Sequence, residues 1–496
     1  MIRVNNDLTG YTLDDYQTLF GRIDGILQKR ELLKERYTRF SSDSSMLYGD
    51  LAIPFEKFIV DLATGYLAGK PSYDIDILND TARDIQKRYF EKDAMDEKQI
   101  EEMKAIIEYV IRYNDDDQEV YKLIHDYLLY GACYEVLYEN EDNNIVYNSF
   151  DASNTVAIWS TDIPRNLIAI VSKYTEQDSQ NNVYDRFRVV DADSMRIYDR
   201  QSDKEIVERT ELSEEKKWSD VPGFACESDF SIIENCESLI NVYENLLKNV
   251  KDTYKYNAED CKLKINGYKA QNRLMVKDNN GNMVINEDRV KEDEYVLSSR
   301  TFYTEEGGDA DWLVKPVDAN GVTTLLKYYV DSIFQICGIP NTADLAFNSS
   351  DLNASAIDRK FYIMNIKTEE IVSDIKKGLL RRFELIFNRL NQKFSTKYDF
   401  RYINIDIAKN LPSMEDETID RMKKLEGIIS EQTIVETLGY DYESEKSKKE
   451  NEVDELQLPG QSSNEDEDGP KQDEEENLES NEGSKSEDDE GETSRE

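Results

Sequence analysis

One very long amphipathic segment restricts the possible folds of this chain more than any other feature. Apolar side chains recur along it every three or four residues, which is the spacing of one face of an α-helix. They are Ile357, Phe361, Met364, Ile371, Ile375, Leu379, Phe383, Ile386, Leu390 and Phe394. About 38 residues with a rise of about 1.5 Å each give a helix of about 57 Å, longer than the usual helix of a globular domain. A coiled coil is the alternative, but the irregular spacing favours a helix packed inside a larger structure.

The balance of charges excludes one class of function. The chain has 496 residues, which is enough for about three domains of ordinary size. It contains 61 Lys and Arg against 104 Asp and Glu, a formal net charge of −43. A protein that holds duplex DNA by neutralising its phosphates needs clustered Lys and Arg, so this chain is not expected to grip DNA in that way. No basic leader followed by an apolar run is visible, and no apolar run reaches the ~18 residues that cross a bilayer, which predicts a soluble, intracellular protein without a membrane partner.

One stretch, TGYLAGKP at 64–71, is similar to a phosphate-binding loop. The loop needs four residues between its glycines, but only three separate Gly65 from Gly69. Pro71 stands where a Ser or Thr hydroxyl would bind Mg²⁺, and it also lacks a backbone donor. We therefore interpret the stretch as a helix end, with Gly69 as a left-handed cap, Lys70 near the negative end of the helix dipole and Pro71 preventing continuation.

The other chemically reactive residues have structural explanations. The five cysteines form no C-x-x-C pair and are predicted to be reduced, mostly structural thiols: Cys133, Cys226, Cys236, Cys261 and Cys337. The only histidine, His125, is predicted to be a packing or surface residue rather than a general base. Residues 115–117, all Asp, predict a solvated turn between helices, with a bound hard cation as the alternative. KDNNGN at 277–282 predicts a hairpin turn with positive φ at Gly281. We predict no catalytic residue, no metal ligand and no cofactor.

The predicted elements follow a distinctive order. Helical spacing is followed by short β-branched and aromatic strands, and then by two helices that enclose a second group of strands with tight turns. The helices are predicted at 12–41, 53–69, 78–92, 96–113, 231–260, 320–337 and 357–394, and the strands at 134–225, 261–316 and 398–407. A polar segment, 341–355, precedes the long helix. Ser413 and Ser430 are predicted N-caps of two further helices. Residues 464–496 hold 16 Asp and Glu against 3 Lys and Arg, and are predicted to be disordered.

This order, together with three local stretches, resembles the portal proteins of tailed bacteriophages, of the type common in long-tailed phages of Gram-positive hosts. The stretches are IPFEKFIVDLATGYLAGKPSYD (53–74), ADWLVKPVDANGVTTLLKYYVDSIFQICGIPN (310–341) and NLPSMEDETIDRMKKLEGIISEQTIVETL (410–438). The first contains the Y-L-x-G-K-P ending that is usual in the family. The likeness covers residues 40–445. Many relatives carry a Ser-Gly pair just before the long helix, where this chain has Asn353, Ala354 and Ser355.

The resemblance implies an α+β, mainly helical portal fold with wing, stem, clip and crown regions, assembling as a cyclic ring. The implied regions are the wing, 1–230; the first stem helix, 231–260; the clip, 261–316; the second stem helix, 317–340; the tunnel loop, 341–355; the long wing helix and strand, 356–410; the crown helices, 411–445; and an acidic disordered tail, 446–496. Twelve subunits would surround a channel at one capsid vertex, in the virion and, during assembly, in the host cytoplasm. The genome would be packaged through this channel and later ejected.

The resemblance also implies site residues and partners. The polar tip of the tunnel loop would face DNA through Asn348, Ser349, Ser350, Asp351, Asn353 and Ser355. Lys327 would touch phosphate in the stem, and Asp311 and Trp312 would dock partners on the clip. The implied partners are other copies of the chain, double-stranded DNA, the terminase large subunit as the motor, a head–tail adaptor, and the major capsid and scaffolding proteins. An acidic wall would let DNA slide, because it does not neutralise phosphates. The alternative is an acidic scaffolding or DNA-mimic protein without a channel.

Overall fold

The computed structural model describes most of the chain as far as residue 410. The described residues are 1–4, 8, 10–39, 53–75, 88, 95–177, 181–201, 206–215, 218–260, 262–266, 272–298, 306–341 and 354–410, with isolated positions between 430 and 449. They belong almost entirely to the first of two compact units, Met1–Ser413. The helix predicted at 78–92, the helices predicted after 411, the acidic tail and most of the segment 341–355 lie outside the described residues.

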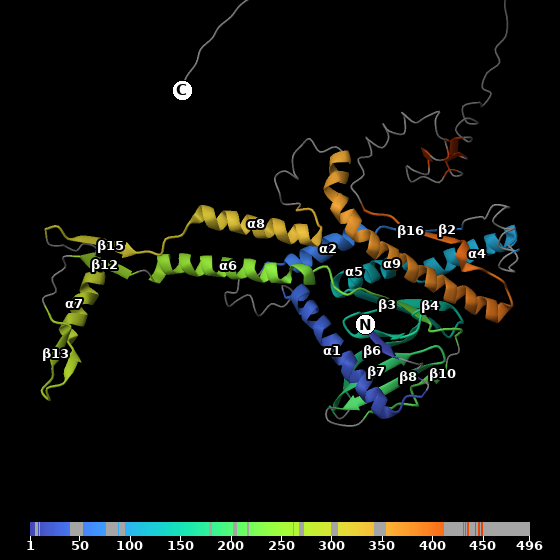
Figure 1. Ribbon diagram of the computed structural model, residues 1–496, viewed down its shortest axis with the longest axis horizontal. Helices are drawn as coiled ribbons and strands as arrows, with labels where there is room; N and C mark the ends of the chain where they lie inside the picture. The colour runs from blue at the N-terminus through green and yellow to red at the C-terminus, as the bar shows by residue number, and fades with distance from the viewer. Residues whose placement is uncertain are drawn as a thin grey trace, which may run out of the picture. The chain divides into compact units, whose positions relative to one another are not determined.

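Helix α1 (Leu13–Thr38) and a seven-stranded sheet form the N-terminal layer (Figure 1). Thr12 and Asp15 cap the helix reciprocally, which fixes where it begins. Phe20 stacks on Phe187 of the sheet with ring centroids 4.0 Å apart. The strands are β1 (Ile2–Val4), β5 (Thr155–Ser160), β6 (Leu167–Gln177), β7 (Val183–Val190), β8 (Ser194–Gln201) and β10 (Glu214–Glu215) in that order, with β9 (Val207–Glu208) beside β8. The strands predicted within 134–225 are thus confirmed, while β1, whose pairing with β5 is parallel, has too short a sequence to be predicted.

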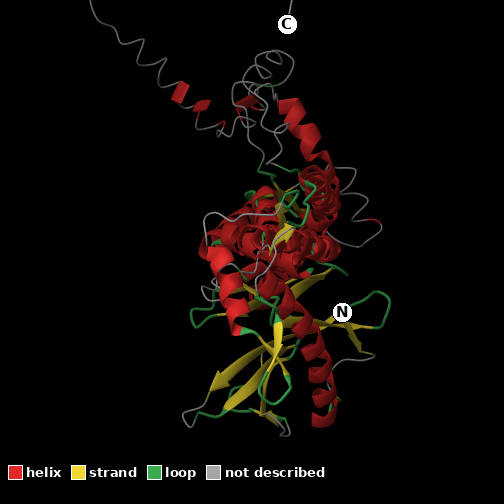
Figure 2. Cartoon of the chain, turned by 90° about the vertical axis from the view of Figure 1, so that its left-hand side faces the viewer, coloured by secondary structure: helices red, strands yellow, loops and turns green. Residues whose placement is uncertain are grey.

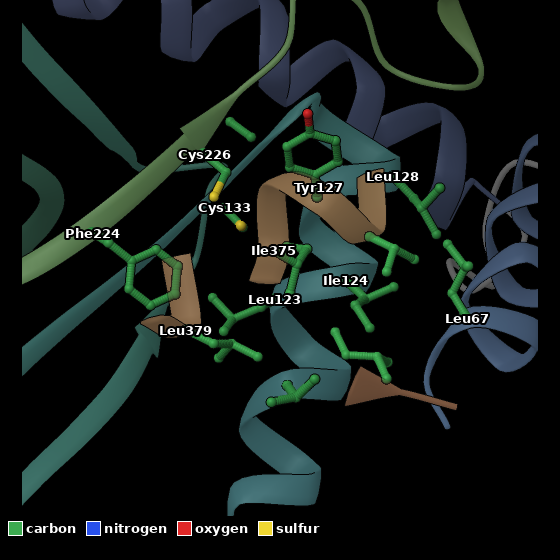
Figure 3. Close-up of a cluster of buried hydrophobic side chains, with 14 of the residues drawn as sticks. Leu67, Leu123, Ile124, Tyr127, Leu128, Cys133, Phe224, Cys226, Ile375 and Leu379 are labelled. Carbon is green, nitrogen blue, oxygen red and sulfur yellow. The ribbon is translucent and has the colours of Figure 1, made fainter. Parts of the chain in front are cut away.

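A second and larger core lies between helices and two smaller sheets, and Figure 2 shows the helices gathered together beside the strands. Its members come from both ends of the compact unit, so residues far apart in sequence meet here. The helices are α2 (Phe55–Leu67), α4 (Glu97–Tyr113), α5 (Asp116–Tyr130) and α9 (Ala354–Phe394). One sheet contains β11 (Gly223–Glu227), β3 (Ala132–Glu139) and β4 (Ile145–Phe150), and the other pairs β16 (Ile403–Ile407) with β2 (Pro71–Ile75). Figure 3 shows side chains from α2, α5, β3, β11 and α9 meeting in this core.

Helix α9 confirms the predicted long helix and is 41 residues long. Its predicted apolar stripe is buried through the middle of the helix, where Ile375, Leu379 and Phe383 pack in the second core. The stripe ends in solvent at Phe394, which is 68% exposed. A 3-10 turn (Phe400–Tyr402) then leads the chain back along β16, so the strand predicted over 398–407 is confirmed only from Ile403 to Ile407.

The middle of α9 is fixed by a buried ion cluster around Arg382, whose side chain is 0% exposed. Its Nε donates to Glu135 Oε1 at 2.7 Å, and its other nitrogens bond to Glu135 Oε2 and Asp116 Oδ1. The guanidinium lies 3.9 Å from the ring centroid of Tyr147, whose hydroxyl donates to Asp116 at 2.9 Å. Burial raises the pKa of the Glu135 carboxyl, while the Arg382 charge opposes that rise. The cluster therefore joins α9, α5 and β3 through mutually paired charges.

The position of Asp116 corrects the prediction of a solvated turn. Asp115 adopts a left-handed conformation, with φ of 49°, at the start of α5. The next residue, Asp116, is only 1% exposed and contacts Arg382. The sequence pattern of three acids indicated exposure because the partner, Arg382, is distant in sequence. The alternative of a cation at this turn is not supported by the contacts of Asp116, whose oxygens accept from Arg382, Tyr73 and Tyr147.

Gly69 also differs from its prediction. Helix α2 ends at Leu67, and Gly69 is not among the described glycines with positive φ, so it is not a left-handed cap. A Cβ at Gly69 would instead lie 1.9 Å from the carbonyl oxygen of Ala408. Gly69 is therefore required for the close approach of two backbone segments, directly before Pro71 pairs with Ile407. Pro71 occupies the first position of a strand, a place where a missing donor is tolerated.

Replacing Arg382 by Leu should leave two buried acids without their partner. We expect Arg382→Leu to lower the free energy of unfolding by about 3–5 kcal/mol, because an uncompensated buried charge is costly. Lys98→Ala removes an exposed ion pair with Glu102 and should change it by about 0.5 kcal/mol or less. Chemical denaturation of both variants measures the difference. Equal stability of the two variants would show that the cluster does not anchor α9.

Two glycines of the TGYLAGKP stretch provide a matched comparison. Gly69→Ala should destabilise the protein by about 1–3 kcal/mol, because the new methyl group overlaps the Ala408 backbone. Gly65→Ala meets no atom within 4 Å and lies inside α2, so it should leave stability unchanged or raise it by up to about 1 kcal/mol. Thermal unfolding of both variants tests this. A harmless Gly69→Ala substitution would contradict the assigned close approach.

Candidate functional site

Two antiparallel helices, α6 (Glu237–Lys255) and α8 (Ala319–Cys337), lie side by side and form a ribbon (Figure 1). They confirm the helices predicted at 231–260 and 320–337. A 3-10 turn (Glu234–Cys236) precedes α6 and a π-helical turn (Tyr256–Asp260) follows it. Ser231 and Glu234 exchange hydrogen bonds ahead of this run, and Asp318 caps α8 by accepting from the Gly321 N–H. The ribbon begins and ends where the sequence supplies capping residues.

One end of the ribbon is anchored in the second core. Ile240 and Tyr243 of α6, and Ile333 and Phe334 of α8, are buried there. Ion pairs add to this contact, because basic residues in and directly after α1 face acids of α6 and of the 3-10 turn before it. The pairs are Lys29–Glu234 at 2.6 Å, Arg36–Glu237 at 3.3 Å and Arg39–Glu244 at 2.6 Å. Beyond this end the ribbon buries little of its surface.

The ribbon does not carry the acidity of the whole chain. The charged residues of α6 are Glu237, Glu244, Asp252, Lys248, Lys251 and Lys255, and those of α8 are Lys327 and Asp331. Positive and negative side chains balance in both helices. The remaining exposed polar residues of α8 include Asn320, Thr323, Thr324 and Gln335. The expectation of an acidic wall therefore does not follow from these two helices, which are close to neutral and present amide and hydroxyl groups.

The far end of the ribbon carries two small sheets and a helix. β12 (Lys262–Asn266) pairs with β15 (Asp309–Leu313), and β13 (Met275–Lys277) pairs with β14 (Met283–Ile285). The β13–β14 turn confirms the predicted hairpin, with Gly281 at φ of 81°. Helix α7 (Glu287–Ser298) corrects the prediction of strands alone at 261–316. Its charged sequence, EDRVKEDEYVLS, lacks a clear apolar period, so its helical state could not be recognised.

Exposed apolar side chains lie on these elements, without cover from the rest of the described chain. We call them the distal apolar surface: Leu274, Met275, Val276, Met283, Val284, Ile285, Tyr295, Trp312, Leu313 and Val314, all exposed. Every residue of β13 and β14 is exposed. An isolated two-stranded hairpin is marginally stable in water, and large exposed apolar areas mark interaction sites. This surface is thus suited to contact with another protein.

The predicted site residues fall in different parts of the structure. Lys327 is exposed on α8, with no ion pair among the described residues. Asp311 and Trp312 lie on β15, where Trp312 is 52% exposed and Asp311 accepts from the Trp312 N–H at 2.8 Å. Ser355 lies within α9, which begins at Ala354, so the predicted loop is shorter than 341–355. The other predicted loop residues lie outside the described residues: Asn348, Ser349, Ser350, Asp351 and Asn353.

The end of α8 is held against α9. Gly338 follows α8 in the left-handed conformation, with φ of 73°, and its N–H bonds to the Gln335 carbonyl. The Lys367 ammonium of α9 donates to the Ile336 carbonyl, a cation at a helix C-terminus. A Cβ at Gly338 would lie 2.4 Å from the Lys367 Cδ. These contacts fix the point from which the chain leaves α8 before it returns in α9.

The other candidate residues show no assembled reaction centre. The His125 ring contacts Tyr37 edge-on and its Nδ1 lies 3.3 Å from Asp126, which is the packing role that the sequence predicted. Four of the five cysteines are free and buried, namely Cys133, Cys226, Cys236 and Cys337, and Cys261 lies outside the described residues. Within the described residues, His, Cys, Asp and Glu form no group that could hold a metal ion, and no helix is long and apolar enough to span a membrane.

The architecture is mixed α+β and of the portal type. It consists of a long helix packed on small sheets and a two-helix ribbon with a β-rich end. The chain belongs to the phage portal protein family, because the family described as phage portal protein, SPP1 Gp6-like, matches residues 14–456. A comparison with curated proteins found no match.

Three solved structures contain chains similar to this one. The first is described as the neck of a native GTA particle computed with C12 symmetry; it is 12% identical, the match covers 78% of this chain and 90% of that chain, and the TM-score is 0.41. The second is described as the virion of a native gene transfer agent particle, with 12% identity, coverage of 83% and 93%, and a TM-score of 0.42. The third is described as the neck of an empty GTA particle computed with C6 symmetry, with 13% identity, coverage of 80% and 93%, and a TM-score of 0.41. These TM-scores are low, and the family match alone carries the assignment.

The α8–α9 junction gives a direct test. Gly338→Ala should destabilise the protein by about 1–2 kcal/mol from the left-handed backbone, and further through the contact with Lys367. In a Lys367→Ala background the same substitution should cost less, because the side chain that the new Cβ meets is gone. A double-mutant cycle by thermal unfolding separates the two contributions. Equal costs in both backgrounds would contradict the contact.

Proposed function

We propose that this chain forms a closed ring whose α6–α8 ribbons surround a channel for double-stranded DNA at one vertex of a phage capsid. In this role the genome enters through the channel during packaging, leaves through it during ejection, and the ring is the platform for head–tail attachment. The proposal rests on membership of the portal family and on one observation above all: the ribbon and its distal apolar surface are largely uncovered in a single copy.

A neighbouring copy of the chain is the partner that fits the uncovered ribbon. Exposed apolar residues lie along both helices: Val242, Tyr254, Leu325, Tyr328 and Ile336. Beyond them, two two-stranded sheets have edges that no other described strand covers, and such edges offer backbone groups that another chain can pair with. In a ring, one side of each ribbon contacts the preceding copy and the other side contacts the next copy. Both sides of every ribbon are therefore covered, and the closed ring leaves no subunit with a free interface. We propose twelve copies in the virion.

The chemistry of the ribbon suits passage rather than binding. A groove that holds DNA uses several Lys and Arg to release counterions, and α8 has only Lys327 and Asp331 as charged residues. Lys327 would then make at most a transient phosphate contact in each copy. Amide and hydroxyl groups such as Thr323 and Gln335 form hydrogen bonds that water can replace easily. We infer that the channel wall binds DNA weakly along its whole length and offers little resistance to its movement.

Other parts of the chain receive proposed roles on the same basis. Residues 1–230 and 356–410 would form the wing, 231–260 and 317–340 the stem, 261–316 the clip, 341–355 the tunnel loop and 411–445 the crown. Asp311 and Trp312 would contribute to docking of the terminase large subunit and later of a head–tail adaptor. The wing would face the major capsid and scaffolding proteins. The protein would act in the virion, and in the host cytoplasm during assembly, without catalysis of its own.

Electron microscopy of the purified protein tests the proposal. We expect rings with a central hole, whereas an acidic scaffolding or DNA-mimic protein would give compact particles without one. Combined Met283→Ser, Val284→Ser and Ile285→Ser substitutions should abolish ring formation, or raise the protein concentration that it needs at least tenfold, because they remove exposed apolar contacts.

The control variant Val183→Ser removes an exposed apolar residue from β7, outside the ribbon, and should assemble normally. The monomer of the triple variant should unfold at an unchanged temperature, because the three side chains are exposed within one copy. Intact rings in the triple variant would remove the distal apolar surface from the assembly. Particles without a hole in the wild-type protein would overturn the proposed function itself.

A further inference from the structure

Cys133 and Cys226 lie directly opposite each other in the three-stranded sheet. Cys133 is in β3 and Cys226 in β11, and they are register partners in the antiparallel pair. Figure 3 shows their sulfur atoms next to each other, and both thiols are free. Directly opposed residues of antiparallel strands have Cα atoms about 4.5–5.5 Å apart, which is within the range of about 4.4–6.8 Å that a disulfide spans. The backbone geometry therefore permits a bond between them.

The two thiols differ in their access to small molecules. Both side chains are buried, Cys133 at 0% and Cys226 at 8% exposure, but only Cys226 lines an open cavity of about 390 Å³. Trp159, Phe224 and Gly378 also line this cavity. Cys226 Sγ lies 3.2 Å from the Asp374 carbonyl oxygen of α9, which holds the sulfur in place. Burial raises the pKa of the Cys133 thiol, and the neighbouring Cys226 thiol raises it further. A reagent from solvent thus reaches Cys226 first.

We propose that Cys133 and Cys226 form a reversible thiol–disulfide pair that is oxidised by a low-molecular-weight disulfide entering this cavity. The Cys226 thiolate attacks one sulfur of the reagent RS–SR, forms a mixed disulfide and releases RS⁻. Cys133 then loses its proton and attacks the Cys226 sulfur, which forms the protein disulfide and releases the second RS⁻. The two thiol protons end on the two released thiolates, giving two RSH. Two electrons pass from the cysteine pair to the reagent.

The position of the pair gives the bond a structural consequence. It would close a loop that contains β4 to β10, including nearly all of the seven-stranded sheet. Such a bond stabilises mainly by restricting the unfolded chain. β11 also packs against α9 and leads toward Ser231, where the run into α6 begins. The bond would therefore hold the strand from which the ribbon starts.

The redox compartment sets when the bond forms, and this step rests on the proposed function in a virion. Thiols remain reduced in a cytoplasm, while disulfides persist in oxidising surroundings. Rings would be assembled with the pair reduced, and particles released from the cell would acquire the bond. The chemistry itself can be measured on purified protein, whether or not rings form.

The experiment treats folded, full-length protein with 2-hydroxyethyl disulfide, quenches free thiols, and maps disulfide-linked peptides by mass spectrometry. We expect the peptides of Cys133 and Cys226 to be joined, and dithiothreitol to separate them. Cys236 and Cys337 are also neighbouring thiols, and peptide mapping distinguishes a link between them from the link between Cys133 and Cys226. The oxidised protein should unfold about 3 °C or more above the reduced protein.

Two variants identify the order of the steps. Cys133→Ala should stop at the mixed disulfide on Cys226, and Cys226→Ala should give neither the mixed disulfide nor the link. Neither variant should gain thermal stability from the reagent. A wild-type protein that keeps a mixed disulfide on Cys226 without transfer to Cys133, or that does not react at Cys226, would overturn the proposal. Either result would leave the assembly of rings unaffected, so the two proposals fail independently.

Discussion

The buried guanidinium of Arg382 is the interaction on which the arrangement of the main body depends. It satisfies Asp116 at the start of α5 and Glu135 in β3, and all three side chains are withdrawn from water. A helix held only by an apolar face could slide along its partners with little change in buried area. A guanidinium bonded to two acids at fixed positions allows only one register of the helix. The long helix α9 is thereby set in register against α5 and β3. The same helix contacts β11, and its Lys367 holds the end of α8.

From this fixed body the ribbon of α6 and α8 extends with five large apolar side chains exposed, namely Val242, Tyr254, Leu325, Tyr328 and Ile336. Its anchored end combines buried side chains with ion pairs to α1, whereas its far end carries β13 and β14, in which every residue is exposed. A monomer built in this way leaves much of its apolar surface in water, which is unfavourable unless a neighbour covers it. Anchoring at one end and exposed apolar residues at the other are properties that suit assembly into a ring of identical subunits. The near balance of charge on the ribbon contrasts with the acidity of the whole chain.

The sequence predicted elements with strong periods and missed features that depend on distant partners. The stripe from Phe361 to Leu390 predicted α9, and the turn at Gly281 predicted a hairpin, because both signals are local. The burial of Asp116 and the role of Gly69 could not be predicted, since the contacts that decide them come from Arg382 and Ala408. α7 was missed because its sequence lacks an apolar period. For the site, the helices of the ribbon were predicted, but their neutrality was hidden by the acidity of the whole chain, and the predicted loop residues 348–353 lie outside the described residues.

The central claim is that copies of this chain enclose an open channel whose wall does not hold DNA. A cryo-EM reconstruction of the purified assembly measures this most directly, because it shows both the bore and the side chains that line it. We predict a continuous bore, wide enough for duplex DNA and about 20 Å or more across, bordered by α6 and α8 with polar, nearly neutral side chains. A closed centre, or a bore lined by clustered Lys and Arg from other elements, would contradict the account.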